Sequence, residues 1–317
     1  MDFITVHNGE IALNVSIAGK GPLILCVHGW PELSYSWRHQ LSYFAERGYT
    51  VAAMDVRGYG GSSRPHAVEA YTLRNIAEDV VAVINQIGAG RAILVGHDWG
   101  APIVWTTVVL HPGIVTAVAG LSVPHIPAGD VSFVDSVREI YADRFFYMIY
   151  FQAEGVAEAE LEADILASLR KIYFAASGDA PHGAWFNRKP VGAKLLDGMV
   201  DPKPYPAWMS TADLDVYAKA FRDGGFRGPL NRYRAQRLDP ADLADIRGRP
   251  VIQPSCFIAG ERDIVRELIP GIDLFADPGA NCTDFRGSFI IPRAGHWVQQ
   301  EAPAETNAAL EQFLSGL

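Results

Sequence analysis

Short, continuous apolar runs alternate with helix-like amphipathic segments over the first 125 residues of the chain. Such runs are typical of strands buried on both faces, and helices between successive strands make those strands parallel. The pattern therefore predicts an α/β fold with a mostly parallel, twisted sheet and helices on both of its faces. The expected strands are residues 24–27, 49–54, 92–95 and 115–123, and the expected helices between them include 76–87 and 101–110.

The pattern changes after Pro124, where helix-like stretches and irregular loops replace the alternation until about Asp245. Within this segment, apolar residues at helical spacing predict a helix over residues 158–173. The acidic run 158–164 is expected to be a solvated face of that helix.

Strand-like runs return after this segment, at residues 256–258 and 288–291, and a closing helix is expected at 304–314. The chain is therefore expected to contain one α/β core that is interrupted by an inserted, mainly helical cap, or lid, domain. The predicted boundaries are 1–124 for the first part of the core, 125–245 for the cap and 246–317 for the second part of the core.

The composition is that of a folded protein, because 49% of the 317 residues are hydrophobic and 20% are charged. The net charge of −9 disfavours nucleic acid as a partner, since an acidic surface repels the phosphate backbone. No stretch approaches the about 18 apolar residues of a membrane span, and the N-terminus has no leader-like pattern. Together with three widely spaced cysteines, these features predict a cytoplasmic protein.

The motif Gly96-His97-Asp98-Trp99-Gly100 lies between an expected strand and an expected helix. This is the context of a nucleophile elbow, in which small neighbours permit a tight turn with an exposed nucleophile at its tip. Here the tip is Asp98, whose carboxylate is already charged at neutral pH and can attack an electrophilic carbon to form an ester. Taken alone, Asp98 has an alternative interpretation as a helix N-cap.

The motif His28-Gly29-Trp30-Pro31 follows the first core strand. In a nucleophile-elbow fold, this loop and the residue after the nucleophile each supply a backbone N–H to an oxyanion hole. The expected donors are the N–H groups of Trp30 and Trp99. The Trp30–Pro31 bond is a candidate cis peptide.

Gly295-His296-Trp297 follows the last expected strand, and it places a histidine late in the chain. The order nucleophile, acid, histidine is that of the α/β hydrolases, which makes His296 the candidate general base. The acid between them is expected to be Asp263, which would orient and support the imidazole. Glu261 is the competing carboxylate and ranks second.

Together, these motifs resemble those of the soluble epoxide hydrolases of the α/β-hydrolase fold, and the resemblance extends over nearly the whole chain. Residues 146–161 resemble the first cap segment of that family, and Asn231-Arg232-Tyr233-Arg234 resembles its second cap motif. Vertebrate members carry an additional N-terminal phosphatase domain. This chain is expected to lack it, because the core pattern begins almost at Met1.

The resemblance implies that each cap motif carries a tyrosine that points toward the nucleophile. Matched position by position, these residues are Tyr147 and Tyr233, with Tyr150 as the alternative for the first. A phenol is neutral near pH 7 and can donate a hydrogen bond or a proton to the oxygen of an epoxide. The substrate pocket is expected to include Pro31, Phe151, Met148 and Trp297.

The implied function is an epoxide hydrolase in which Asp98 opens the ring, forms a covalent ester and releases a vicinal diol after water attack. No cofactor and no metal are expected, and the chain contains no P-loop and no HExxH motif. The expected partners are a small apolar epoxide and water, with neither nucleic acid nor membrane, and a homodimer is compatible with the sequence. The alternatives are a haloalkane or haloacid dehalogenase on the same fold, and a non-catalytic small-molecule-binding protein.

Overall fold

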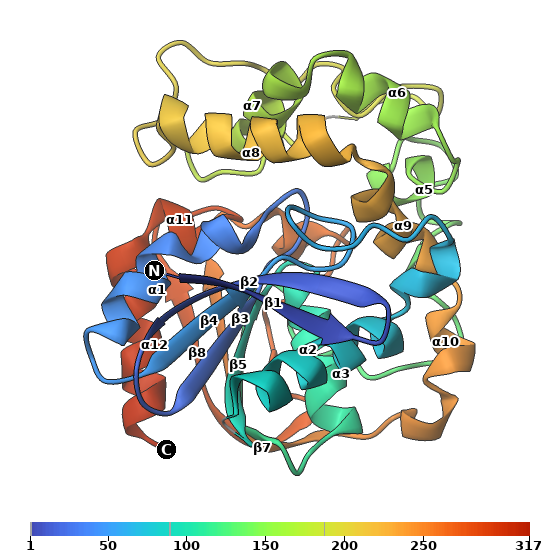
Figure 1. Cartoon of the computed structure of the whole chain (residues 1–317). Helices are drawn as coiled ribbons and strands as arrows, with labels where there is room; N and C mark the ends of the chain where they lie inside the picture. The colour runs from blue at the N-terminus through green and yellow to red at the C-terminus, as the bar shows by residue number, and fades with distance from the viewer. Residues whose placement is uncertain (1, 89, 187) are drawn as a thin grey trace.

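The computed structural model describes residues 2–88, 90–186 and 188–317. These residues form an eight-stranded sheet in the order β1-β2-β4-β3-β5-β6-β7-β8 (Figure 1). The pairs β1–β2 and β2–β4 are antiparallel, and all other neighbours are parallel. The strands are β1 (Asp2–Asn8), β2 (Ile11–Gly19), β3 (Leu23–Val27), β4 (Thr50–Met54), β5 (Ala92–His97), β6 (Val115–Leu121), β7 (Val251–Gly260) and β8 (Cys282–Ile291).

Helices cover both faces of the sheet, because successive residues of the central strands point to opposite sides. Leu25 of β3 packs in one apolar cluster with Val80 and Val104, whereas Cys26 packs in another with Phe44 and Phe313. The helices concerned are α2 (Leu73–Ile87) and α3 (Gly100–Leu110) on one face, and α1 (Arg38–Ala45) and α12 (Pro303–Ser315) on the other. The predicted fold class is confirmed.

The described residues between β6 and β7 form helices, turns and loops. Figure 1 shows α6, α7 and α8 as a layer above the sheet, and α7 packs against α8. The boundaries proposed for this cap at residues 125 and 245 stay a prediction. Its helices are α4 (Phe133–Ser136), α5 (Tyr147–Tyr150), α6 (Val156–Ala163), α7 (Ile165–Ala175), α8 (Thr211–Gly224), α9 (Arg227–Ala235) and α10 (Asp239–Asp242).

Short helical turns complete the chain beside the long elements. They are η1 (Ser34–Trp37), η2 (Val68–Tyr71), η3 (Ala244–Ile246), η4 (Ile264–Glu267) and α11 (Val298–Glu301). In the part of the chain that the structure describes, no helix is long and apolar enough to cross a membrane.

The strand order brings the loops that contain the predicted site residues together at the carboxyl ends of the parallel strands. β3 pairs with β5 so that Val27 lies opposite Gly96, and the loops that follow both strands therefore begin side by side. β7 pairs with β8 so that Gly260 lies opposite Ile291, which places the next two loops together as well. The carboxyl ends of parallel strands are where α/β folds build their sites.

One expectation about the elements is wrong, and one feature was not anticipated. The antiparallel hairpin β1–β2 has no counterpart among the expected strands, because β1 is an edge strand with an exposed face and no continuous apolar run. The single helix expected over 158–173 is two helices, since Asp164 takes an extended backbone conformation and its side chain accepts the Ala167 N–H at 3.0 Å. An aspartate in this arrangement begins a new helix.

The acidic run 158–164 is also not simply a solvated face. Glu158 is buried and forms an ion pair with Arg234 at 2.8 Å. Glu160 accepts the backbone N–H of Leu196 at 2.9 Å, and Glu162 accepts the N–H of Phe226 at 2.8 Å. These carboxylates hold separate cap segments together.

Replacing Asp164 by alanine should lower the free energy of unfolding by about 1 kcal/mol, because the first turn of α7 loses its cap. Urea denaturation would measure the change. Asp164→Asn keeps a side-chain acceptor and is the matched control, so it should stay within about 0.5 kcal/mol of the parent protein. Equal destabilisation by both substitutions would contradict the capping role.

Candidate active site

Asp98 occupies the tip of a tight turn between β5 and α3, with a backbone φ of +51°. This left-handed conformation is unfavourable for a residue with a Cβ atom. The turn closes only because the residues two positions before and two positions after Asp98, Gly96 and Gly100, have no side chain. A Cβ on Gly96 would lie 2.2 Å from the Gly100 oxygen, and a Cβ on Gly100 would lie 2.0 Å from the Val27 oxygen. The geometry is that of a nucleophile elbow.

The loop after β3 closes on the same carboxylate. The Trp30 N–H donates to Asp98 Oδ1 at 2.7 Å, and the Trp30–Pro31 bond is cis, as predicted. A Cβ added to Gly29 would lie 2.3 Å from Asp98 Oδ1 and 2.6 Å from the Trp99 backbone nitrogen. Both predicted oxyanion-hole residues therefore lie beside the Asp98 carboxylate, and the hydrogen bond is the one from Trp30.

His296 lies between two carboxylates. Its Nε2 is 3.3 Å from Asp98 Oδ2, and its Nδ1 is 2.9 Å from Asp263 Oδ1. Asp263 Oδ1 also accepts the N–H of Val265 at 2.9 Å, which fixes the orientation of this carboxylate. The competing Glu261 instead accepts the backbone N–H of Arg293 at 3.0 Å on the exposed surface. The geometry favours Asp263 as the partner of the base.

Asp98, His296 and Asp263 each favour the charged form of their neighbour. Burial opposes the charged form of His296, but the carboxylates of Asp263 and Asp98 raise the pKa of His296 well above its usual range. Burial also opposes ionisation of Asp263, and the His296 ring nevertheless holds the pKa of Asp263 below its usual range. In the resting protein, His296 is therefore an imidazolium between two carboxylates.

Tyr147 of α5 and Tyr233 of α9 are buried together above Asp98, with ring centroids 6.0 Å apart. Burial and the nearby Asp98 carboxylate raise the pKa of both phenols well above its usual range, so both stay protonated at neutral pH. The Tyr150 hydroxyl instead donates to Glu160 Oε2 at 2.9 Å. The geometry favours Tyr147 over Tyr150 as the first cap tyrosine, and the assignment stays a prediction.

A cavity of about 370 Å³ has Asp98, Trp99, Tyr147 and Met148 among its lining residues. Of the four predicted pocket residues, Met148 lines this cavity, whereas Pro31, Phe151 and Trp297 are not part of its lining. Phe151 is fully buried against Tyr233, and the Trp297 ring packs on His296 with centroids 4.7 Å apart. Their role as substrate contacts stays a prediction.

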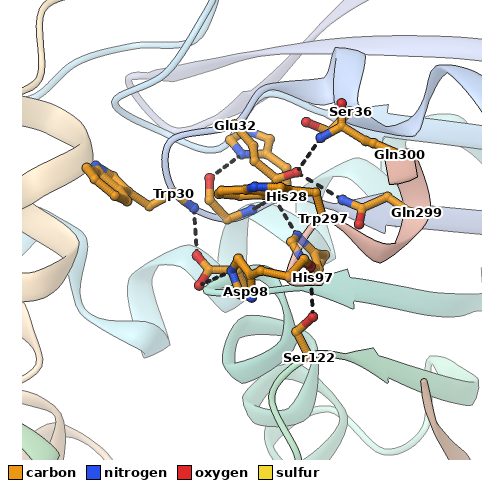
Figure 2. A network of polar contacts seen from close by, with 12 residues as sticks. His28, Trp30, Glu32, Ser36, His97, Asp98, Ser122, Trp297, Gln299 and Gln300 are labelled. Atoms are coloured by element: carbon orange, nitrogen blue, oxygen red, sulfur yellow. Dashed lines mark hydrogen bonds and ion pairs between the residues drawn. The ribbon is translucent and has the colours of Figure 1, made fainter. Parts of the chain in front are cut away.

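A buried polar network beside the nucleophile was not anticipated from the sequence. Figure 2 shows His97 next to Asp98, with Glu32, Gln299 and Gln300 around it. His97 Nδ1 is 2.6 Å from Glu32 Oε2, and its Nε2 is 2.7 Å from the His296 carbonyl oxygen. Glu32 Oε1 accepts from Gln299 at 2.9 Å and from Gln300 at 3.2 Å.

The hydrogen bonds of this network favour the charged form of Glu32. Burial opposes ionisation of Glu32, but the His97 ring and the Gly29 N–H lower the pKa of Glu32 to about 2. The other ring nitrogen of His97 lies 2.7 Å from the His296 carbonyl oxygen, so His97 links Glu32 to the backbone of the base.

Glu301 is a second residue without a sequence signal. Its carboxylate accepts the backbone N–H groups of Gly178 at 2.8 Å, Gly295 at 2.9 Å and Trp297 at 2.9 Å. Burial raises the pKa of Glu301 to about 7 in spite of these donors. The His296 N–H also donates to the Ala176 oxygen at 2.9 Å, so the loop that carries the histidine is bonded to the end of α7.

Comparison with known proteins agrees with this geometry. A family model described as the alpha/beta hydrolase fold matches residues 22–179. Epoxide hydrolase A of Mycobacterium tuberculosis is 41% identical over 98% of this chain and 97% of its own length. Epoxide hydrolase B of the same organism is 36% identical over 94% of this chain and 92% of its own length.

Solved structures show the same relationship. The crystal structure of epoxide hydrolase A from Mycobacterium thermoresistibile superposes with a TM-score of 0.92 at 38% identity, covering 100% of this chain and 98% of that chain. An epoxide hydrolase from an endophytic Streptomyces gives a TM-score of 0.92 at 42% identity, covering 99% of this chain and 95% of that chain. The chain therefore belongs to the epoxide hydrolases of the α/β-hydrolase fold, which confirms the predicted family.

The described residues contain no group of three or more His, Cys, Asp or Glu side chains that could hold a metal ion. The reactive groups that the described residues bring together at Asp98 are carboxylates, a histidine, phenols and backbone N–H groups.

Gly29→Ala should lower kcat/KM for an epoxide by at least about 100-fold, because the new Cβ displaces Asp98 from its partners. Gly113→Ala is the matched control, since nothing lies within 4 Å of its added Cβ. Steady-state kinetics together with thermal denaturation would separate a displaced nucleophile from misfolding. Near-normal kinetics for Gly29→Ala would contradict the close packing on Asp98.

Proposed function

We propose that this chain hydrolyses an epoxide to a vicinal diol through a covalent ester on Asp98. The observation that carries the proposal is the buried line Asp98–His296–Asp263. Asp98 lines the cavity together with the protonated phenol of Tyr147, and the protonated phenol of Tyr233 lies beside that of Tyr147. The names of the relatives support the same reaction.

Ring opening would use the two oxygens of Asp98 differently. Oδ1 is held by the Trp30 N–H, which leaves Oδ2 to attack an epoxide carbon from the side of the cavity. A carbon–oxygen bond forms to Oδ2 while the strained ring bond breaks, and the leaving alkoxide takes a proton from Tyr147 or Tyr233. The product of this step is a hydroxyalkyl ester of Asp98.

Ester hydrolysis would then use His296 as the general base. Formation of the ester removes the negative charge of Asp98, so the pKa of His296 falls. Its proton passes to the tyrosinate left by ring opening, which restores the phenol and leaves His296 as a neutral imidazole. His296 takes a proton from water as the water oxygen adds to the ester carbon, and the N–H groups of Trp30 and Trp99 stabilise the oxyanion. The bond to the diol oxygen breaks and this oxygen takes the proton from His296. The proton of the regenerated Asp98 carboxyl then passes to His296, which restores the resting imidazolium and carboxylate.

A haloalkane or haloacid dehalogenase is the nearest rival, since it would use the same Asp–His–Asp line. A halide leaving group needs no proton, and a buried pair of phenols is suited instead to an oxygen leaving group. A binding protein without catalysis would not need a nucleophile, a base and its carboxylate in line. The pair of phenols and the complete Asp–His–Asp line therefore favour an epoxide hydrolase over both alternatives.

The finer organisation belongs to the same proposal. Residues 125–245 would form the cap, which contributes Tyr147 and Tyr233, and residues 1–124 and 246–317 would form the core. The substrate would be a small apolar epoxide, and the enzyme would be cytoplasmic, in keeping with its free cysteines Cys26, Cys256 and Cys282. Whether it is a homodimer would be read from its mass in solution.

The decisive experiment is a single turnover of an epoxide in ¹⁸O-labelled water with enzyme in excess. The ester mechanism requires the new oxygen of the first diol to come from Asp98, so this diol should be unlabelled. Label in the first diol would mean direct attack by water and would overturn the ester. A parallel assay of halide release from alkyl halides tests the dehalogenase alternative.

Tyr147→Phe combined with Tyr233→Phe should reduce the rate of ring opening by at least about 100-fold, the scale of general acid catalysis. The rate of ester hydrolysis should change far less. Tyr150→Phe is the matched control, and it should leave both steps almost unchanged because its hydroxyl binds Glu160. Rapid-quench measurement of ester formation and decay would distinguish the two steps. Slow ring opening by the Tyr150→Phe variant would contradict the choice of Tyr147 and would indicate that Tyr150 is the donor.

Asp263→Asn should shift the acidic limb of the pH–rate profile for ester hydrolysis to lower pH. The Asp263 carboxylate raises the pKa of His296, so its removal lowers that pKa, and the base becomes neutral at a lower pH. The plateau rate should also fall, because the imidazole loses its orienting partner. Single-turnover decay of the ester across pH measures both effects, and an unmoved or higher-pH limb would contradict the assignment.

A further inference from the structure

Ser122 is a buried residue of the site that the proposed mechanism does not use. It directly follows β6, which lies between β5 and β7, the strands that precede Asp98 and Asp263. The backbone φ of Ser122 is +68°, so it shares with Asp98 the left-handed conformation that is unfavourable for a residue with a Cβ atom. Its N–H donates to the Ile258 oxygen of β7 at 2.9 Å. Strained backbone of this kind concentrates at functional sites, where it directs a side chain.

The Ser122 hydroxyl has two acceptors within its reach. It donates to the His296 carbonyl oxygen at 3.1 Å, and His97 Nε2 lies 2.7 Å from the same oxygen (Figure 2). The second acceptor is the Asp263 carboxylate: burial raises the pKa of Asp263, whereas the His296 ring and a hydrogen bond from Ser122 lower it. A hydroxyl carries one proton and rotates to suit its surroundings, so Ser122 can donate to only one of these two acceptors at a time.

The Asp263 carboxylate is able to accept this donor. Its Oδ1 accepts the Val265 N–H and lies 2.9 Å from His296 Nδ1. Its Oδ2 is buried and accepts no hydrogen bond of ordinary geometry from the described residues. Burial makes a carboxylate oxygen without a donor costly, and the cost rises when the neighbouring imidazolium loses its charge. A donor is therefore needed most at the stage when His296 is neutral.

We infer that Ser122 is a positioning residue whose hydroxyl donates to the His296 carbonyl oxygen while the imidazole is charged, and turns to the Asp263 carboxylate when the imidazole becomes neutral. The hydroxyl keeps its proton in this change, and only a rotation about its Cβ–Oγ bond is needed. The His296 oxygen keeps its contact with His97 when the hydroxyl turns away. The inference rests on the proposed function, because His296 becomes neutral at the ester stage.

Other titratable groups also face the pair of His296 and Asp263. They are Asp98 in the turn after β5, His97 at the end of β5, Tyr147 of α5 and Glu301 of α11. Burial raises the pKa of Glu301 to about 7, so this group titrates in the parent enzyme and in a Ser122 variant alike. The difference between the two pH profiles therefore isolates the effect of the hydroxyl.

The test compares Ser122→Gly with Ser122→Ala by single-turnover decay of the ester across pH. Both substitutions remove the hydroxyl, but only glycine adopts the left-handed backbone without strain. Without the donor, the charge of Asp263 is less compensated and favours the imidazolium, so the pKa of His296 should rise. The acidic limb of the pH–rate profile should therefore move to higher pH by about 0.5 to 1 unit in both variants, less than a full charge would cause. This direction is opposite to the one expected for Asp263→Asn.

Ser168→Ala is the matched control, because this buried hydroxyl donates to the Leu161 carbonyl oxygen at 3.0 Å within the cap. Its acidic limb should coincide with that of the parent enzyme. Thermal denaturation shows whether each variant is folded, and Ser122→Gly keeps the test valid if Ser122→Ala is not.

A parent-like profile for Ser122→Gly would mean that this position serves the backbone alone, and it would overturn the inference. A limb that moves to lower pH in the Ser122 variants would overturn it as well. If the parent enzyme forms no ester at all, the proposed function fails instead, and quenching the parent reaction before product release distinguishes that case.

Discussion

The left-handed backbone at Asp98 is the constraint on which the rest of the site depends. A residue with a Cβ loses roughly 1–2 kcal/mol in this conformation, so the surrounding structure must hold it there. Two glycines of the turn and Gly29 of the adjacent loop provide the space, and the sheet places these loops side by side. The same geometry directs one oxygen of the carboxylate to a backbone N–H and the other to His296.

Alternating charge is the second principle of the site. Asp263, His296 and Asp98 form one line, and Glu32 and His97 form a second pair beside it. Isolated buried charges are very costly, whereas paired and hydrogen-bonded charges persist. Ester formation would remove one charge from the first line and leave the second pair intact, so His97 can hold the His296 backbone throughout the reaction.

The strands, the nucleophile elbow, the histidine and its acid can be predicted from the sequence. These features depend on local rules, such as apolar runs in strands and glycines at tight turns. It does not carry the β1–β2 hairpin, whose edge position leaves only a weak apolar pattern. The helix break at Asp164 is hidden, since the apolar stripe continues across it. Glu32 and Glu301 are hidden for another reason: their main partners are backbone groups or side chains distant in sequence, which no residue pattern reports.

Glu301 joins the end of α7 to the loop of His296 through three backbone N–H groups, and Gly178 and Gly295 pack without room for a side chain between them. The base and this corner of the cap therefore form one mechanical unit. At α9 the inserted segment is bound to the core a second time, because Gly228 packs on Gly58 and Arg232 donates to the Tyr71 carbonyl oxygen. The base and the phenol of Tyr233 are therefore held at two separate seams, and the space left for an epoxide between them is set by both.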